Sequence, residues 1–350
     1  MTSSRAEPAG GPAESTTLHI AARIEDWIHE RRARRARRRG RVATVIPFTG
    51  YGGDGWVRIL GRVVYEDPER ASDPSRRVRG WRSFTSVHAA YAEVTVTSGT
   101  DWEALRADRG GVLDAHVKLA LPAGWNTVRL RVDGGQAVEA PIFVVSGQHR
   151  FGILSDIDDT VMVTALPRPF LAAWNTFVLD EHARRPVPGM AVLYERLAQR
   201  HPGCPVFYLS TGAWNVAPTL SRFLHRNLYP RGPLLLTDWG PTHDRWFRSG
   251  QQHKRESLTR LAHEFPDIRW LLVGDDGQHD EDLYAAFAAE YPQNVAAIAI
   301  RQLTAGEAVL AGGRSRRPDQ ETASTPWVFA PDGAGLSTQL RTLGMLDPRA

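Results

Sequence analysis

Apolar residues follow two different periodicities along the chain. Between residues 42 and 146, apolar and polar side chains alternate with a period of two. The clearest alternating segments cover residues 92–96, 117–121, 128–132 and 138–144. Alternation gives a strand one buried and one solvated face. We therefore predict an all-β domain over residues 42–146, built as a small antiparallel sandwich.

After residue 147 the pattern changes to short, continuous apolar runs. These runs cover residues 152–154, 206–209, 270–273 and 295–300. Helical spacing of apolar residues separates them, as in Met190, Leu193 and Leu197 and in Leu258, Leu261, Ala262 and Phe265. This combination predicts an α/β domain, a Rossmann-like parallel sheet with helices on both faces, over residues 147–305. Residues 306–350 are left as a C-terminal extension.

The N-terminal segment is basic. Residues 1–16 are rich in Ser, Ala, Gly and Pro, and a partial apolar stripe predicts a helix over residues 18–39. Residues 1–41 contain ten arginines, so the net charge of +4 is concentrated there. Two interpretations stay open: a solvated basic helix or tail, or an anchor on an anionic surface such as acidic lipid or nucleic acid.

Composition narrows the class of protein. The single cysteine, Cys204, cannot form a disulfide within the chain, which favours a reducing compartment and an inert, buried thiol. No apolar stretch approaches the ~20 residues of a membrane span. Residues 1–17 lack a segment of signal-peptide type. We expect a cytoplasmic protein, with peripheral membrane contact if the basic segment binds lipid.

Polar residues follow three of the apolar runs. Ser155-Asp-Ile-Asp-Asp-Thr160 follows the first, Ser210-Thr-Gly212 the second, and Gly274-Asp-Asp-Gly-Gln-His-Asp280 the third. In parallel sheets, ligands bind at the carboxyl ends of the strands. Asp156 and Asp158 alternate and would flank one point, where one carboxylate can attack or bind metal and the other can transfer protons. Acids of the third stretch could complete an oxygen shell for Mg²⁺.

Lysine is rare in this chain. Of 43 basic residues only Lys118 and Lys254 are lysines, and the rest are arginines. Since a lysine presents a compact ammonium that arginine cannot replace, Lys254 is a candidate functional residue.

Each short motif taken alone is weak. Asp-x-Asp-x-Thr can be a cap or a turn, and Gly-Asp-Asp-Gly is often a turn. Their joint order at predicted strand ends is the informative feature. The histidines lack zinc-ligand spacing, so we expect no zinc site. The segment with Trp239, Arg245, Trp246 and Arg248 is expected to be a loop, either packed or contacting a second anionic group of a substrate.

Together, these residues resemble the four motifs of the haloacid dehalogenase superfamily of phosphatases. The set is Asp156-Ile-Asp-Asp-Thr160, Ser210, Lys254 and Gly274 to Asp280, with Lys254 at the start of a predicted helix. Residues 143–303 further resemble the catalytic domain of the actin-patch-associated phosphatidate phosphatases and their bacterial relatives, through residues 155–160, 208–210, 234–238 and 274–278 with Asp280 and Tyr284. The chain departs from the fungal enzymes after Ser210, at residues 211–214.

The resemblance implies a role for each matching residue. Asp156 would attack phosphorus and form an aspartyl-phosphate, and Asp158 would protonate the leaving alkoxide and later deprotonate water. Thr160 would orient the loop, Ser210 would bind a phosphoryl oxygen, and Lys254 would neutralise charge.

The implied cofactor is Mg²⁺. Its ligands would be Asp156, the backbone carbonyl of Asp158, and Asp275, with Asp280 nearby. The implied substrate is a lipid phosphate, phosphatidate, and residues 161–205 leave room only for a small cap. One alternative is a phosphatase of soluble or nucleic-acid phosphomonoesters. Another is a scaffold whose β domain binds a protein partner of unknown kind. No nucleic-acid partner is expected.

Overall fold

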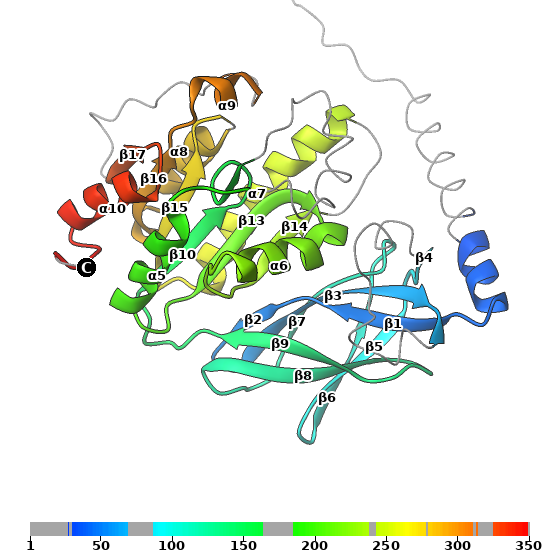
Figure 1. The fold of residues 1–350 in the computed structure, drawn as a ribbon. Helices are drawn as coiled ribbons and strands as arrows, with labels where there is room; N and C mark the ends of the chain where they lie inside the picture. Colours follow the sequence, from blue (N-terminus) through cyan, green and yellow to red (C-terminus); the bar gives the residue numbers. More distant parts are fainter. Residues whose placement is uncertain are drawn as a thin grey trace, which may run out of the picture.

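The computed structural model describes residues 27, 30–68, 87–163, 185–237, 243–277, 279–310, 313 and 325–348. Within helix α7, the side chains of residues 243–249 are excepted. The described chain forms an N-terminal β domain and a C-terminal α/β domain, which lie against each other (Figure 1).

In the β domain, the described strands form one hydrogen-bonded sheet of nine. The main path has the order β1-β3-β2-β9-β8-β5-β6, and β4 and β7 pair with β3. The strands are β1 (Val42–Pro47), β2 (Gly50–Gly53), β3 (Trp56–Glu66), β4 (Val87–His88), β5 (Glu93–Ser98), β6 (Asp101–Arg106), β7 (Val112–Val117), β8 (Gly124–Val132) and β9 (Val138–Val144).

Two details of the predicted β domain are wrong. β2 and β9 run parallel, so the sheet is mixed rather than antiparallel. Side-chain alternation is the same for both pairing directions and therefore could not reveal this. The predicted strand over residues 117–121 is also absent, because β7 ends at Val117. Leu119 is nevertheless buried in the domain core, which explains its apolar character in a loop.

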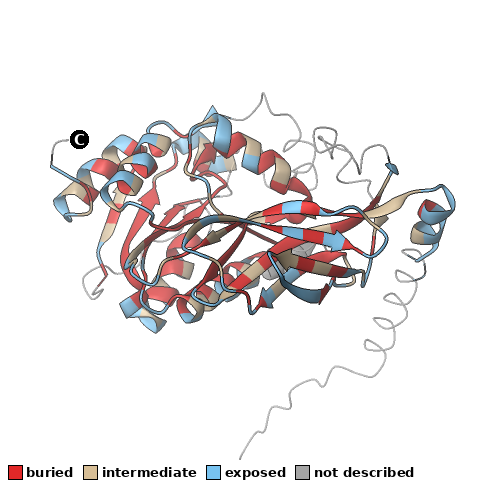
Figure 2. Ribbon diagram, turned by 90° about the horizontal axis from the view of Figure 1, so that it is seen from below, coloured by how far each residue is buried: buried red, intermediate tan, exposed pale blue. Residues whose placement is uncertain are grey.

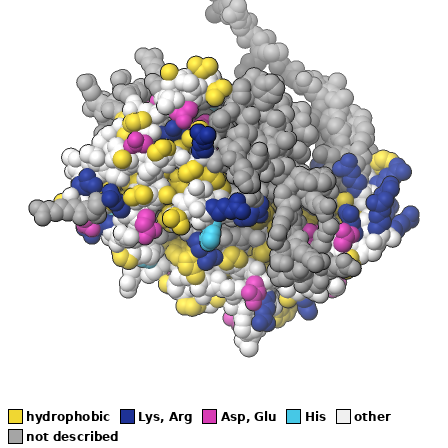
Figure 3. Space-filling view, viewed as in Figure 1, with side chains coloured by type: hydrophobic (Ala, Val, Ile, Leu, Met, Phe, Trp, Pro, Cys, Tyr) yellow, Lys and Arg dark blue, Asp and Glu magenta, His cyan; other side chains and the backbone are white. Residues whose placement is uncertain are grey.

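A short arginine-rich helix packs on the β domain. Residues 30–38 are helical, whereas residues 18–26 of the predicted helix lie outside the described residues. Ala36 is buried and Ala33 packs against the core of the β domain. Arg37 donates a 2.8 Å hydrogen bond to the Tyr65 hydroxyl. The other arginines of this helix are exposed, and they form the basic cluster at the right edge of Figure 3.

The α/β domain contains a parallel sheet of six described strands in the order β14-β13-β10-β15-β16-β17. The strands are β10 (Phe151–Asp156), β13 (Val206–Ala213), β14 (Leu234–Thr237), β15 (Arg269–Asp275), β16 (Val295–Arg301) and β17 (Trp327–Ala330). Helices α5 (Met190–Arg200) and α10 (Gly333–Thr342) contact each other on one face, and α7 (His243–Glu264) and α8 (Asp280–Glu290) on the other (Figure 1). The other elements are β11 (Met162–Val163), β12 (Arg185–Pro186), η3 (Trp214–Val216), α6 (Ala217–Arg226), η4 (Pro292–Asn294) and α9 (Ala305–Leu310).

The central strands are buried on both faces (Figure 2). All seven residues of β16 are buried, which accounts for its continuous apolar sequence. The predicted helical stripes are confirmed, since Met190, Leu193 and Leu197 of α5 and Leu258, Leu261 and Ala262 of α7 are buried. The thiol of Cys204 is also buried, and burial raises its pKa to about 11.

The predicted C-terminal extension is not separate from the α/β domain. β17 is the edge strand of the parallel sheet beside β16, and α10 packs against α5. The domain therefore continues beyond residue 305. A four-residue strand after a segment without clear periodicity gives little sequence signal, which explains the misplaced boundary.

The two domains share a packed interface. Phe48, between β1 and β2, stacks on Trp214 with ring centroids 4.8 Å apart. Tyr51 is fully buried against Phe207 of β13 and donates a 2.8 Å hydrogen bond to Glu264 at the end of α7. The β domain thus touches the strand that carries Ser210 and the helix that carries Lys254.

None of the described helices is both long enough and apolar enough to cross a membrane.

Candidate active site

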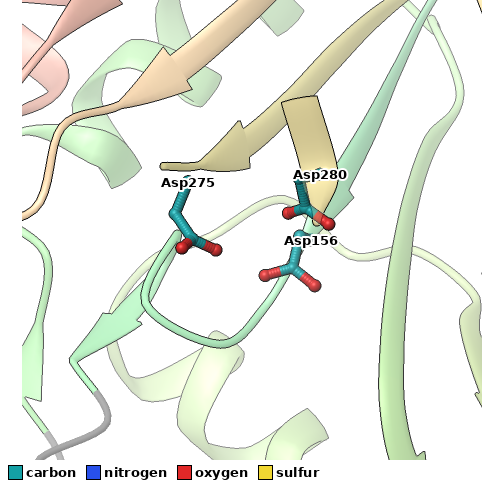
Figure 4. Close-up of side chains that lie close together, drawn as sticks. All are labelled: Asp156, Asp275 and Asp280. Atoms are coloured by element: carbon teal, nitrogen blue, oxygen red, sulfur yellow. The ribbon is translucent and has the colours of Figure 1, made fainter. Parts of the chain in front are cut away.

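Three carboxylates meet at the carboxyl ends of the central strands. Asp156 is the last residue of β10, Asp275 the last residue of β15, and Asp280 the first residue of α8. One carboxylate oxygen from each lies within 4.8 Å of one from each of the others (Figure 4). All three side chains are buried, with at most 2% of their surface exposed. Strand topology therefore brings Asp156 together with two acids that lie more than 100 positions later in the chain.

Lys254 lies inside this cluster. Its Nζ donates hydrogen bonds of 2.7 Å to Asp156 Oδ1 and to Asp280 Oδ1. The predicted position of Lys254 at the start of a helix is wrong, because α7 begins at His243 and Lys254 lies in its middle. The segment around Trp246, which was predicted to be a loop, is part of α7. The predicted helix starts too late, because Gly250, a poor helix former, and several polar residues lie in the first turns of α7 and weaken the helical pattern.

The charges of the site shift the pKa values of its groups. Burial raises the pKa of Asp156 well above its usual range, and repulsion from Asp280 and Asp158 adds to this, although Lys254 opposes it. Burial and repulsion from Asp280 and Asp156 likewise raise the pKa of Asp275. Burial alone would lower the pKa of Lys254, but attraction to Asp156 and Asp280 outweighs burial and raises it. The lysine is therefore held as an ammonium ion.

Asp158 and Ser210 form a second contact beside the cluster. Ser210 Oγ donates a 3.0 Å hydrogen bond to Asp158 Oδ2 and accepts one of 3.0 Å from the Gly212 N–H. The structure thus brings together four predicted catalytic residues, Asp156, Asp158, Ser210 and Lys254. The fifth, Thr160, is fully buried, and its Oγ1 has no hydrogen-bond partner among the described residues. An orienting role for this hydroxyl stays a prediction.

Gly250 allows α7 to approach the end of β13 closely. A Cβ atom at Gly250 would lie 2.9 Å from Thr211 Cγ2 and 3.2 Å from Thr211 Cβ. A side chain at this position would push apart the helix that carries Lys254 and the strand that carries Ser210.

The donor set fits a hard divalent cation. Asp275 Oδ2 and Asp280 Oδ2 are buried and accept no hydrogen bond from the described residues. When ionised, the three carboxylates exceed the single ammonium of Lys254 by two negative charges. Mg²⁺ prefers such oxygen ligands and would balance this charge. Asp156, Asp275 and Asp280 are the side chains that would hold it. The predicted ligation by the backbone carbonyl of Asp158 stays a prediction.

Two supporting residues were not foreseen. Tyr194 of α5 shares a 2.6 Å hydrogen bond with Ser155 Oγ directly before Asp156. Arg301 contacts the loop after Asp158, because its Nη1 donates a 2.7 Å hydrogen bond to the Asp159 carbonyl oxygen. A charged residue at the end of the apolar run 295–300 is the signal that could have identified Arg301. Asp238, Trp239, Gln278 and the segment 164–184, where a small cap was predicted, lie outside the described residues.

A family comparison covers the part of the chain that contains this cluster. Residues 151–302 match the family model for the catalytic domain of phosphatidate phosphatase APP1. The match begins at the first residue of β10 and ends one residue after β16, so it contains every predicted site residue.

Two yeast proteins are similar to part of this chain. Phosphatidate phosphatase APP1 of Saccharomyces cerevisiae is 27% identical over 156 residues, which is 44% of this chain and 26% of the relative. An uncharacterized protein of Schizosaccharomyces pombe is 26% identical over 166 residues, which is 47% of this chain and 27% of that protein. The chain thus spans about a quarter of the length of these relatives. For residues 151–302, the similarity supports the prediction of a phosphoric monoester hydrolase.

Among solved structures, the alignment with a carbohydrate acetylesterase from Xanthomonas citri covers 77% of this chain and 73% of the acetylesterase chain. The sequence identity is 9% and the TM-score 0.29, too low to inform the fold or the activity.

Proposed function

We propose that this protein is a Mg²⁺-dependent phosphatase that hydrolyses a phosphomonoester through an aspartyl-phosphate on Asp156, and that its α/β domain is haloacid dehalogenase-like. The observation that carries the proposal is the buried cluster in which Lys254 bonds both Asp156 and Asp280 beside Asp275. Structural ion pairs seldom leave two unbalanced charges in a buried place, because the desolvation cost is high. In a site that binds a divalent cation, the cation would balance these two excess negative charges.

In the first step, a carboxylate oxygen of Asp156 attacks phosphorus and the bond from phosphorus to the ester oxygen breaks. Asp158 donates a proton to the departing alkoxide. In the second step, Asp158 takes a proton from water, the water oxygen attacks phosphorus, and the bond to Asp156 breaks. Inorganic phosphate leaves and both side chains return to their starting state.

Ser210 and Lys254 stabilise the transferring group. Ser210, now bonded to Asp158, is placed to donate to a phosphoryl oxygen, while the ammonium of Lys254 offsets charge on the phosphate and on Asp156. Bound Mg²⁺ would supply Lewis-acid stabilisation of the phosphoryl oxygens. Preorganised charge of this kind is the main catalytic contribution in phosphoryl transfer.

The proposed substrate is a lipid phosphate, phosphatidate. Support comes from the similarity of residues 151–302 to the catalytic domain of a phosphatidate phosphatase. A phosphatase of soluble or nucleic-acid phosphomonoesters is the alternative, and a non-catalytic scaffold is less consistent with an intact set of Asp156, Asp158, Lys254 and Asp275. Phosphate release from phosphatidate vesicles, soluble aryl phosphates and nucleotides, with and without Mg²⁺, distinguishes these candidates. Asp156→Asn should abolish release, and release that persists in this variant would refute the nucleophile.

The proposed partner of the arginine-rich helix is an anionic membrane surface. Its small residues Ala33 and Ala36 face the β domain, which leaves Arg32 and Arg35 exposed. Each surface arginine near anionic lipid contributes about 1 kcal/mol to binding. The double variant Arg32→Gln/Arg35→Gln should bind phosphatidate vesicles about 30-fold more weakly, which corresponds to about 2 kcal/mol.

The matched control is Arg129→Gln/Arg131→Gln, which removes two exposed arginines from β8. This control should bind vesicles like the unchanged protein. The rate on a soluble aryl phosphate should be unchanged in both double variants. Equal loss on vesicles and on the soluble substrate would refute the membrane role.

A further inference from the structure

Arg301 is a buried arginine whose three guanidinium nitrogens all donate hydrogen bonds. It is the last residue of β16 and only 3% exposed. Its Nη2 donates to both carboxylate oxygens of Glu307, at 2.8 and 3.0 Å, and its Nε donates to the Pro331 carbonyl oxygen at 3.2 Å. The two-pronged pairing with Glu307 offsets the cost of burying the guanidinium and fixes its orientation.

The remaining nitrogen of Arg301, Nη1, contacts the loop that follows Asp156. Nη1 donates a 2.7 Å hydrogen bond to the carbonyl oxygen of Asp159, the residue directly after Asp158. Asp159 has a φ of 55°, a left-handed conformation that is uncommon for a residue other than glycine. Such a conformation persists only where the surroundings enforce it. Arg301 and the Asp159 N–H bond to the Met162 carbonyl oxygen, 2.8 Å long, enforce it here.

The backbone of Arg301 contacts the loop that follows Asp275 at the end of β15. Its carbonyl oxygen accepts a 3.0 Å hydrogen bond from the Asp276 N–H, directly after Asp275. Asp276 Oδ1 in turn accepts a 2.8 Å hydrogen bond from the Leu303 N–H. One residue thus ties the loop after Asp156 to the loop after Asp275. β10 and β15 are neighbours in the sheet, and the loops that follow them are both hydrogen-bonded to Arg301 at the end of β16.

We propose that Arg301, oriented by Glu307, is a positioning residue that sets the separation of Asp156 and Asp275 and thereby the affinity for the divalent cation. The proposal rests on the proposed function. Arg301 does not contact the carboxylates of the cluster in the described structure, so its effect acts through the two loops. By charge alone, loss of this cation near three acids would tighten Mg²⁺ binding. Displacement of the two loops would weaken Mg²⁺ binding, so the charge effect and the positioning effect have opposite signs.

The test uses the full chain and two readouts. Calorimetry with MgCl₂ alone gives the Mg²⁺ affinity, and phosphate release at varied MgCl₂ gives the concentration for half-maximal rate. For Arg301→Gln, and for Arg301→Lys, which keeps the charge, Mg²⁺ affinity should fall at least tenfold. High MgCl₂ should restore much of the rate. A fold that is merely destabilised would instead lower the rate equally at every MgCl₂ concentration.

Controls make each result decisive. Arg269→Gln removes an arginine that bonds the Val295 carbonyl oxygen at the opposite end of the sheet, and it should leave Mg²⁺ affinity unchanged. If Arg301→Gln does not fold, Glu307→Gln releases the guanidinium while Arg301 stays, and it should weaken Mg²⁺ binding at least threefold. Mg²⁺ affinity within twofold of the unchanged protein in folded Arg301 or Glu307 variants would overturn the positioning role. If the unchanged protein neither binds Mg²⁺ nor releases phosphate, the proposed function fails, and the positioning role fails with it.

Discussion

Lys254 donates a 2.7 Å hydrogen bond to Asp156, a residue 98 positions earlier in the chain. Both side chains are buried, and the pair forms because α7, which packs against β13 and β14, brings Lys254 to the carboxyl end of β10. The ammonium of Lys254 favours the ionised form of Asp156 and so opposes the effect of burial, and a nucleophilic carboxylate must be ionised. The contact therefore connects the fold with the proposed chemistry.

Lysine at position 254 should be irreplaceable by arginine. Its ammonium donates to Asp156 and Asp280 from a buried position, and the larger planar guanidinium does not fit this geometry. Lys254→Arg should lower kcat by about 100-fold, comparable to the loss of one preorganised donor. Steady-state phosphate release measures this. Lys118→Arg, the same exchange at the other, exposed lysine, should leave kcat unchanged. A Lys254→Arg variant with normal kcat would exclude the proposed role.

The interface between the domains should contribute to stability through Glu264. This carboxylate accepts hydrogen bonds from the Tyr51 hydroxyl at 2.8 Å and from the Arg58 guanidinium at 2.8 and 3.1 Å. Tyr51→Phe should cost about 1 kcal/mol of unfolding free energy, because one buried hydrogen bond is lost. Glu264→Ala should cost about 2 kcal/mol, because the buried Tyr51 hydroxyl loses its acceptor and Arg58 keeps only Asp114 as a partner.

Urea denaturation measures both changes. Asp347→Ala serves as the control, since it breaks an exposed ion pair with Arg200, and such pairs contribute about 0–1 kcal/mol. Losses for Glu264→Ala no larger than for Asp347→Ala would mean that the domains do not depend on this contact.

Gly250→Ala should reverse the usual effect of alanine in a helix. Alanine normally stabilises a helix by up to about 1 kcal/mol relative to glycine. Here the added methyl group would lie 2.9 Å from Thr211 Cγ2, beside Ser210. We expect no gain in stability and a kcat about tenfold lower, because the catalytic groups are displaced. Gly306→Ala in α9 meets no atom within 4 Å and should raise stability. Thr211→Ser, which removes the closest contact, should partly restore kcat in Gly250→Ala.

His253 should make the fold sensitive to acid. Burial lowers its pKa to about 4, although a hydrogen bond with the Leu235 backbone opposes this shift. In the unfolded chain the pKa is about 6.5, so between pH 6.5 and 4 the unfolded state takes up a proton that the folded state does not. This contribution is fully present above pH 6.5 and is lost as the pH falls towards 4.

Thermal or urea unfolding at several pH values checks this sign. Relative to His253→Gln, the unchanged protein should lose about 2 kcal/mol of unfolding free energy between pH 7.5 and 5, from 1.4 kcal/mol per pKa unit. His225→Gln removes an exposed histidine of α6 and should keep the pH dependence of the unchanged protein. If His253→Gln and the unchanged protein showed the same pH dependence of unfolding free energy, His253 would not be the cause of the acid sensitivity.

Several polar residues of the site were predictable because they follow apolar runs of the sequence, and parallel strands align their carboxyl ends. Asp156, Asp158, Ser210 and Asp275 were found in this way. The position of Lys254 within α7 was not, because Gly250 and the polar residues around it weaken the helical pattern. The close approach of Gly250 to Thr211 supplies a reason for that glycine that only the tertiary structure reveals.

Contacts between distant segments were beyond the reach of pattern reasoning. The bonds of Arg301 to Asp159 and of Tyr51 to Glu264 join residues 142 and 213 positions apart. Periodicity reports which face of an element is buried, but it does not identify the group that packs there. The parallel pairing of β2 with β9 was missed for the same reason, whereas the edge strand β17 was missed because four residues give little periodic signal.

The covalent intermediate is tested most directly by trapping it. The full chain, mixed with an aryl phosphate and MgCl₂, is quenched in acid and reduced with borohydride, which converts an aspartyl-phosphate to homoserine. Peptide mass spectrometry then identifies the modified residue. We predict homoserine at position 156, dependent on both substrate and MgCl₂ and absent when MgCl₂ is replaced by a chelator. Phosphate release with no modification at Asp156, or with the modification at another acid, would contradict the proposed mechanism.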